Sequence, residues 1–328
     1  MKNVGWVCNF LSYFFAFSLS AENVEECSST KVLICGVCRN VEKHVPKVIE
    51  NAESLGKRFA DYQVIIYENN SSDETANLFK KWSLENSRVL FLSEYLSSDE
   101  MPKARTEKIA RARNMVLTAA RDEKYQTFDY LFMVDLDSGC AWPIDEIIRT
   151  VNSEKEWDCV SANDLYSHGN VYRDRYSFRD ARYPFGPELI GDAWWGLMNK
   201  TKFKIDQPEW LSVYSAFGGM AIYRTKSILP FSYSGIVTED LRQFYETILS
   251  HTPRDHPQRV VYQLRLYKDG LHIPSHKSVV VFHPNTHSER PFDYPYVTVC
   301  EHVTLHAAMA THGYGKFYIN PKMVMRFN

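Results

Sequence analysis

The stretch IIYENNSSDET, residues 65–75, changes abruptly from strand-forming to turn-forming residues. Isoleucine and tyrosine favour an extended strand, whereas two asparagines and two serines favour a turn. The apolar spacing of the following DETANLFKKWSLE, residues 73–85, indicates a helix. The stretch therefore predicts a strand, a turn and a helix, in which Asp73 either caps the helix or accepts a hydrogen bond from a ribose.

The same alternation extends to both sides of this unit. Further strands are predicted at 31–38, 88–94 and 128–138, and further helices at 41–56 and 106–121. Such alternation implies parallel strands joined by right-handed crossovers. Ligands of these sheets bind at the carboxyl ends of the strands, where the turn 68–75 is predicted to lie. That turn is interpreted either as part of a ligand site or as a plain capped turn.

Composition and charge exclude some classes of function. The chain of 328 residues is 45% apolar and 24% charged, which is typical of a folded soluble protein. Its 38 basic and 40 acidic side chains give a formal net charge of −2, and no stripe of Lys and Arg alternates with aromatic residues. Nucleic acid is therefore not an expected partner.

The N-terminal segment differs from the rest of the chain. Lys2 precedes an apolar run from Val4 to Leu19, and small residues follow before the first acid, Glu22. This layout predicts a signal peptide over residues 1–21. An uncleaved membrane anchor is the close alternative, because the run approaches the lower limit of about 17 residues for crossing a bilayer. A buried helix is the third interpretation of this segment. Residues 30–328 are predicted to form one soluble domain.

The cysteines are consistent with a secreted or luminal protein. Of seven cysteines, loss of Cys8 with a signal peptide would leave six, an even number compatible with disulfides. Cys35 and Cys38 have the spacing of a redox motif, but Cys35 lies inside an apolar run that is typical of a strand. Both are interpreted as structural.

Two aspartates end the predicted strand FDYLFMVDLDS, residues 128–138. Asp135 and Asp137 stand at positions i and i+2, so both can reach one cation if the chain bends there. Carboxylate oxygens suit Mg²⁺ or Mn²⁺, and such a metal would neutralise a diphosphate leaving group.

Three stretches together resemble the GT-A class of nucleotide-sugar glycosyltransferases: YENNSSDET (67–75), RTEKIARARNMVL (105–117) and FDYLFMVDLDS. The resemblance implies a single GT-A domain, a Rossmann-like α/β/α sandwich that uses Mn²⁺ or Mg²⁺ and a GDP- or UDP-linked sugar. It also implies roles for individual residues: the nucleoside is held by Glu68, Asn70 and Asp73, the donor lies near Arg113 and Asn114, and the metal is coordinated by Asp135 and Asp137. More narrowly, IYENNSSDET, the RARN helix and VYRDRYSFRD (171–180) are similar to fungal Cap59-like mannosyltransferases.

Two segments of the second half extend this resemblance. SAFGGMAIYRT (215–225) resembles the strand on the acceptor side, where Gly218 and Gly219 would let the backbone approach a sugar. VCEHVTLHAAMATHGYGKFYINPKM (299–323) resembles the segment that begins with an acidic pair and continues as a helix and a strand. Here Glu301 and His302 replace the usual Glu-Asp pair. The resemblance implies that His302 is a metal ligand or a base and that Glu301 contacts the acceptor.

Some motifs carry competing interpretations. His302, His306 and His312 have the spacing of an extended zinc-protease signature, but Val303 replaces the glutamate that this mechanism needs. A zinc hydrolase is therefore a weaker alternative, and His306 is interpreted as a core histidine. Glu239 and Asp240 are interpreted as acids of a helix N-terminus. Further predictions place Trp194 and Trp195 in the core and Arg175 or Arg179 at the donor diphosphate.

These motifs predict a metal-dependent glycosyltransferase that moves a hexose to a hydroxyl of a glycan or protein. The narrower resemblance implies mannose. The second class considered is a non-catalytic, glycosyltransferase-like carbohydrate-binding protein, which the altered acidic pair would explain. The N-terminal segment predicts the lumen of the Golgi, with the protein either signal-cleaved or anchored, or a cytosol-facing membrane if the organism is bacterial.

Overall fold

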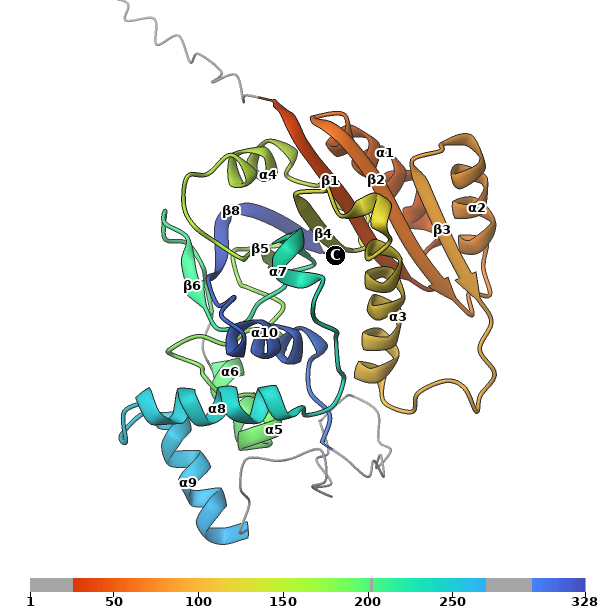
Figure 1. Ribbon diagram of the computed structural model, residues 1–328. Coiled ribbons are helices and arrows are strands. Elements are labelled where there is room, and N and C mark those ends of the chain that lie inside the picture. Colours follow the sequence, from red (N-terminus) through yellow and green to blue (C-terminus); the bar gives the residue numbers. More distant parts are fainter. Residues whose placement is uncertain (1–25, 201–202, 270–296, 328) are drawn as a thin grey trace, which may run out of the picture.

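The computed structural model describes residues 26–200, 203–269 and 297–327. The predicted signal peptide or anchor, residues 1–21, lies outside them. Within these ranges the strands form one eight-stranded sheet in the order β3-β2-β1-β4-β7-β5-β8-β6 (Figure 1). The strands are β1 (Cys27–Cys38), β2 (Phe59–Asn69), β3 (Val89–Glu94), β4 (Tyr130–Asp135), β5 (Cys159–Tyr166), β6 (Leu211–Val213), β7 (Met220–Arg224) and β8 (Phe317–Phe327).

The helices connect these strands and cover the sheet. They are α1 (Val45–Gly56), α2 (Thr75–Glu85), α3 (Arg105–Ala120), α4 (Ile144–Val151), α5 (Pro187–Ile190), α6 (Ala193–Lys200), α7 (Thr225–Ile228), α8 (Glu239–His251), α9 (Pro257–Asp269) and α10 (Glu301–Thr311). The first predicted helix starts later than expected, because Glu42–His44 form a short 3₁₀ turn before Pro46 at the start of α1.

The first half of the sheet is parallel, as the alternating pattern predicts. β1 pairs with β2 and β4, and β2 pairs with β3, all in the parallel sense. In the second half β7 runs antiparallel to its neighbours β4 and β5. The start of β7 therefore lies beside the carboxyl end of β4.

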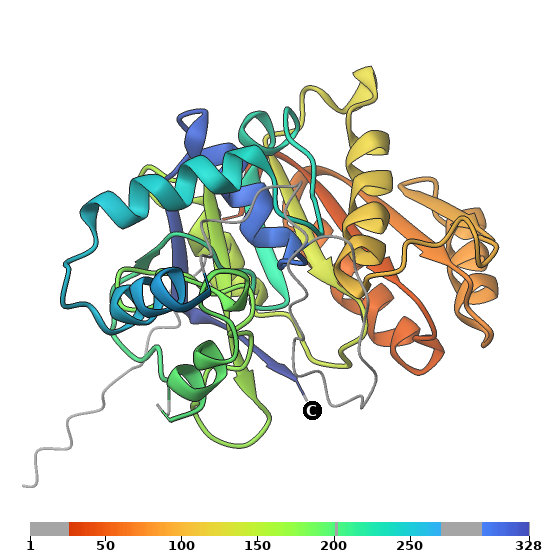
Figure 2. The ribbon, with the colours of Figure 1, turned by 90° about the horizontal axis from the view of Figure 1, so that it is seen from below.

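Alternating residues of the strands face two separate cores. Val32 and Ile34 pack toward α1, α2 and α4, whereas Leu33 and Cys35 pack toward α3, α8 and α10. Figures 1 and 2 show α3, α8 and α10 together on one side of the sheet. The predicted single α/β/α sandwich is confirmed.

The described residues also bear on the cysteines and on membrane insertion. The six described cysteines form no disulfide with one another. Cys35 is buried in β1, as expected for a structural residue. No helix within 26–200, 203–269 or 297–327 has the length and apolarity that a bilayer crossing requires.

Candidate active site

One cavity of about 570 Å³ opens at the carboxyl edge of the parallel strands. The ends of β1, β2 and β4 meet it from one side, and the start of β7, the start of α10 and the segment 173–177 meet it from the other. Its lining includes five basic and four acidic side chains: Arg39, Arg105, Lys108, Arg113 and Arg173, with Asp135, Asp137, Asp174 and Glu301. This is the edge at which the sequence predicts ligand binding.

Arg113 forms the floor of the cavity. Its side chain is only 4% exposed, and Nη2 donates to Oδ1 of Asp135 at 2.9 Å while Nε lies 3.3 Å from Oε1 of Glu301. Nε and Nη1 form no hydrogen bond with any described residue. Burial opposes the charge, but Asp135 and Glu301 raise the pKa of Arg113 above its ordinary value. A buried arginine with unused donors therefore borders the cavity.

Asp135 and Asp137 both reach the cavity but differ in environment. Asp135 ends β4, where removal from bulk water raises the pKa of its carboxyl to about 7, against the opposing effect of Arg113. Asp137 follows on the surface and is exposed. Two adjacent carboxylates suit a hard divalent cation. Among the residues described, no three His, Cys, Asp or Glu side chains are grouped to hold a metal, so His302 does not join the two aspartates as a third ligand.

His302 lies in the cavity wall as a buried imidazole. Its ring stacks on Phe217, with centroids 3.8 Å apart and planes 16° from parallel. Burial, with further effects of Arg113 and His306, holds the pKa of His302 well below its usual range. Nε2 has no hydrogen-bond partner among the described residues and lies 3.7 Å from Oε1 of Glu301. His302 is therefore a neutral hydrogen-bonding group beside the cavity.

The other histidines of the zinc-like spacing do not converge on it. His306 is fully buried, with Nδ1 2.9 Å from Oγ of Ser215 and Nε2 3.0 Å from the Tyr223 hydroxyl, and burial lowers its pKa to about 3. The interpretation of His306 as a core histidine is confirmed. His312 ends α10 with its side chain 59% exposed. The arrangement therefore gives no support to a zinc hydrolase.

The turn after β2 contributes less to the cavity than predicted. Asn69 lines it, whereas Glu68, Asn70 and Asp73 do not. Instead, Glu68 accepts a hydrogen bond from the Ser71 amide. The side-chain amide of Asn70 donates to the carbonyl of Leu96 and accepts from its N–H. Asp73 accepts from the amides of Glu42 and Thr75. All three predicted nucleoside ligands are thus bonded within this turn or to the neighbouring segments after β1 and β3, and none of them lines the cavity. The physical reason is that turn residues satisfy nearby backbone groups.

Gly218 and Gly219 bring the start of β7 to the cavity. Their φ angles are +67° and +75°, and a Cβ at Gly218 would lie 2.2 Å from the carbonyl oxygen of Ala162. Gly219 lines the cavity, and its carbonyl accepts from the Asp135 amide at 2.9 Å. Gly219 thus brings backbone to the cavity, Gly218 is absent from its lining, and the approach to a sugar stays a prediction.

The segment 171–180 forms part of the cavity wall. The sequence predicted this segment at the site, but not which of its residues line the cavity. Neither Arg175 nor Arg179, the two predicted donor contacts, lines the cavity. Arg175 donates to the carbonyl of Met198, and Arg179 is fully buried beside Glu188. The side chains that do line it were missed: Arg173, Asp174, Tyr176 and Ser177. The recurrence of tyrosine and arginine marks the segment, but an irregular backbone gives no period from which to choose among its residues.

The remaining candidate residues lie away from the cavity. Glu239 and Asp240 are the first-turn acids of α8, which confirms their interpretation. Trp194 is fully buried, as predicted, and its ring meets that of Trp195 edge to face. Asn114, expected near the donor, instead exchanges two hydrogen bonds with the backbone of Tyr233. Asn114 thereby fixes the loop that carries the Tyr233 ring to within 5.7 Å of the Arg113 guanidinium.

The fold and cavity define a single-domain α/β protein with a mixed acidic and basic ligand site. No family model and no curated protein matches the chain. Among solved structures, a mannosyltransferase of Pyrobaculum calidifontis with GDP-Man and Mn²⁺ is 12% identical, with a TM-score of 0.36 over 62% of this chain and 48% of that one. S. aureus TarS with UDP is 14% identical, with a TM-score of 0.37 over 62% and 50%.

A third match is glucosyl-3-phosphoglycerate synthase of Mycobacterium tuberculosis with Mn²⁺, UDP and phosphoglyceric acid. It is 16% identical, with a TM-score of 0.33 over 62% of this chain and 60% of that chain. The chain thus spans about half to three fifths of the length of these proteins. At such TM-scores the likenesses do not assign a function.

Proposed function

We propose that this protein is a metal-dependent glycosyltransferase that moves a hexose from a nucleotide-diphosphate sugar to a hydroxyl of a glycan or protein. One observation supports this most directly. Two neighbouring carboxylates and a buried arginine with unused donors share a cavity at the carboxyl edge of a parallel sheet. Carboxylates for a divalent cation and a guanidinium for phosphate are the groups that a diphosphate donor needs.

The donor set fits Mn²⁺ or Mg²⁺ that is shared between protein and substrate. Asp135 and Asp137 offer carboxylate oxygens, and the described residues provide no third acidic or histidine ligand beside them. Mg²⁺ is commonly held by one or two carboxylates together with substrate phosphates. Asp135 and Asp137 would hold the metal, and the bound metal would supply positive charge to the departing nucleoside diphosphate.

The other lining residues have roles that follow from charge and position. Arg39, Arg105 and Lys108 are exposed at the rim, where they favour entry of an anionic donor. Arg113 lines the cavity between Asp135 and Glu301, where its guanidinium would contact the diphosphate. Glu301 and His302, the first residues of α10, would contact the acceptor. The neutral imidazole of His302 suits a hydrogen bond with a sugar hydroxyl better than proton uptake.

The test is release of nucleoside diphosphate from a panel of UDP- and GDP-sugars, with Mn²⁺ and after chelation. The wild type should release it from at least one donor only when metal is present. Asp137→Asn should lower this rate by at least roughly 100-fold, because a metal contributes several kcal/mol to the barrier. Asp255→Asn, an exposed aspartate between α8 and α9, is the matched control and should not change the rate.

Two outcomes would decide against the proposal. Full activity of Asp137→Asn with Mn²⁺ would contradict the metal site. Donor binding without release of nucleoside diphosphate would favour the non-catalytic carbohydrate-binding alternative. Mannose as the transferred hexose rests on the Cap59-like stretches alone, and the same panel tests it. The Golgi or membrane location stays a prediction, because it rests on residues 1–21.

A further inference from the structure

We infer that Asp174 is the base that accepts the proton of the acceptor hydroxyl. This inference rests on the proposed function and assigns to Asp174 a role that the resemblance implied for His302. Asp174 lies in the segment between β5 and α5 and lines the cavity. Its side chain is half-buried.

The carboxylate of Asp174 is held by one oxygen only. Oδ2 accepts from Oγ of Ser177 at 2.6 Å and from the amide of Gly218 at 3.0 Å. Oδ1 accepts no hydrogen bond from a described residue, and no described cation lies within ion-pair distance of either oxygen. The orientation of the group is thus fixed while one oxygen stays available to a ligand. A general base needs both properties.

The other carboxylates of the cavity are already engaged. Asp135 accepts from Arg113 and is assigned with Asp137 to the metal. Glu301 is only 6% exposed, and its Oε1 lies 3.3 Å from Nε of Arg113. Oε1 of Glu301 is thus engaged by the guanidinium of Arg113, whereas Asp174 forms no ion pair with a described residue. Asp174 is therefore the carboxylate best suited to receive a proton.

The position of Asp174 relative to the metal ligands also fits this role. Gly218 donates to Asp174, and the next residue, Gly219, accepts from the amide of Asp135. One dipeptide thus links the proposed base to a proposed metal ligand. Asp174 nevertheless forms no metal-binding group of three with other described residues. It lies near the reacting centre without belonging to the metal site.

The step is balanced as a single displacement. The O–H bond of the acceptor breaks and its proton passes to Oδ1 of Asp174. The acceptor oxygen forms a bond to the anomeric carbon, and the bond from that carbon to the phosphate oxygen breaks. The electron pair of that bond leaves with the nucleoside diphosphate. Water can take the place of the acceptor, so donor hydrolysis requires the same proton transfer.

The experiment compares water with azide as the nucleophile, using the donor that the wild type cleaves in the panel. Azide is an anion and needs no base. Asp174→Asn should lower hydrolysis by roughly 100-fold or more, and added azide should restore nucleoside diphosphate release with formation of a glycosyl azide. The affinity for nucleoside diphosphate with Mn²⁺ should stay within about twofold of the wild type.

Two further variants show whether the loss has another origin. Ser177→Ala removes one hydrogen bond to Oδ2 and should lower hydrolysis only several-fold, with the same response to azide. Glu301→Gln should show no selective rescue by azide. Unfolding curves for each variant verify that the fold is intact.

The outcomes separate the two proposals. If the wild type cleaves no donor, the proposed function itself is refuted. If the wild type is active and Asp174→Asn hydrolyses at a similar rate, or loses hydrolysis without rescue by azide, Asp174 is not the base. Selective rescue of Glu301→Gln instead would assign the role to Glu301.

Discussion

Two arginines are buried among the residues that the structure describes, Arg113 and Arg179, and they differ in how many of their N–H donors are used. Arg179 is fully buried and uses all five N–H donors: Nη2 contacts both oxygens of Glu188, Nη1 contacts the carbonyls of Tyr176 and Phe178, and Nε contacts the Tyr245 hydroxyl. Arg113 is almost as buried, but only its Nη2 donates to a described residue.

The difference separates a structural charge from a charge that the proposed ligand would contact. Burying a charge is unfavourable unless its hydrogen bonds are satisfied. Around Arg179 the protein itself supplies every acceptor, and Glu188 is also bonded by Tyr245. Around Arg113 the acceptors of the protein leave Nη1 unsatisfied at a cavity wall. In the proposed function, a bound ligand would supply the missing partner.

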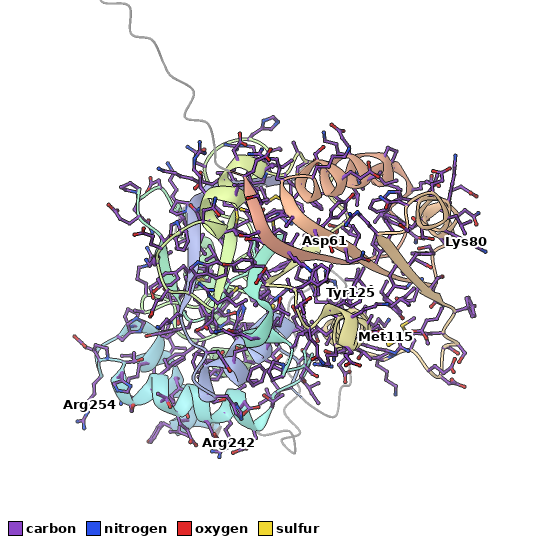
Figure 3. The ribbon with its side chains drawn as sticks, turned by 45° about the horizontal axis from the view of Figure 1, so that its top comes forward. Asp61, Lys80, Met115, Tyr125, Arg242 and Arg254 are labelled. Atoms are coloured by element: carbon purple, nitrogen blue, oxygen red, sulfur yellow. The ribbon has the colours of Figure 1, made fainter. Side chains whose placement is uncertain are left out.

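The largest expected effect is on stability at Arg179. Arg179→Met leaves Glu188 buried without its cation and should lower the free energy of unfolding by about 3–5 kcal/mol. Arg242→Ala is the control, because Arg242 pairs with Glu239 and Glu246 on the outer side of α8, at the periphery of the molecule (Figure 3). That exposed network should contribute far less to stability than the buried pair, because solvent screens exposed ion pairs.

Urea unfolding of both variants measures the difference. Equal loss of unfolding free energy in the two variants would mean that the buried pair is no more important to the fold than the surface pair. The structural role assigned to Arg179 would then be wrong.

The second expected effect is on ligand affinity at Arg113. Arg113→Lys keeps a positive charge beside Asp135 and Glu301 but removes the planar guanidinium. It should weaken binding of nucleoside diphosphate with Mn²⁺ by roughly 10- to 100-fold, since a hydrogen bond to a charged group contributes about 1.5–3 kcal/mol. Its loss of stability should be smaller than that of Arg179→Met. Calorimetric titration measures the affinity, and unchanged affinity in this variant would show that the unused donors do not face the ligand.

Arg113 and Arg179 also differ in how well the sequence predicts their positions. Arg113 lies on a helix of clear period and could be linked to Asp135, the end of a predicted buried strand. Both belong to the regular parallel half, where alternation determines which residues share an edge. The antiparallel direction of β7 was not predictable in this way, because the local pattern of a strand carries no information about its partner.

The irregular segment 171–180 shows the limit of that approach. Its three arginines are chemically alike, yet Arg173 lines the cavity, Arg175 donates to a carbonyl and Arg179 is buried in the core. Without a helical or strand period, only the tertiary contacts decide between them. The same holds for Glu68, Asn70 and Asp73, whose residue types favour ligand binding and loop closure equally well.

The smallest expected effect is on the pH dependence of stability, and it concerns Asp164, a buried carboxylate whose hydrogen bonds are only partly satisfied. Asp164 in β5 is fully buried; Oδ1 accepts from Nε of Arg173 at 3.0 Å, while Oδ2 has no partner among the described residues. Burial raises the pKa of Asp164 from 3.8 to about 7, with Asp174 adding to the effect and Arg173 opposing it. The folded protein therefore binds more protons than the unfolded chain between these values, and this contribution to stability falls as the pH rises through them.

Asp164→Asn removes the titrating group and should remove this pH dependence. Near pH 4 the carboxyl is protonated in the folded protein, so variant and wild type should have similar unfolding free energies. At about pH 8 the variant should be more stable by roughly 1–2 kcal/mol, because it no longer buries a half-satisfied charge. Urea unfolding across this range measures the difference. A variant less stable than the wild type at the higher pH would mean that Arg173 fully compensates the buried charge of Asp164. The Arg173–Asp164 pair would then resemble the fully satisfied pair of Arg179 and Glu188.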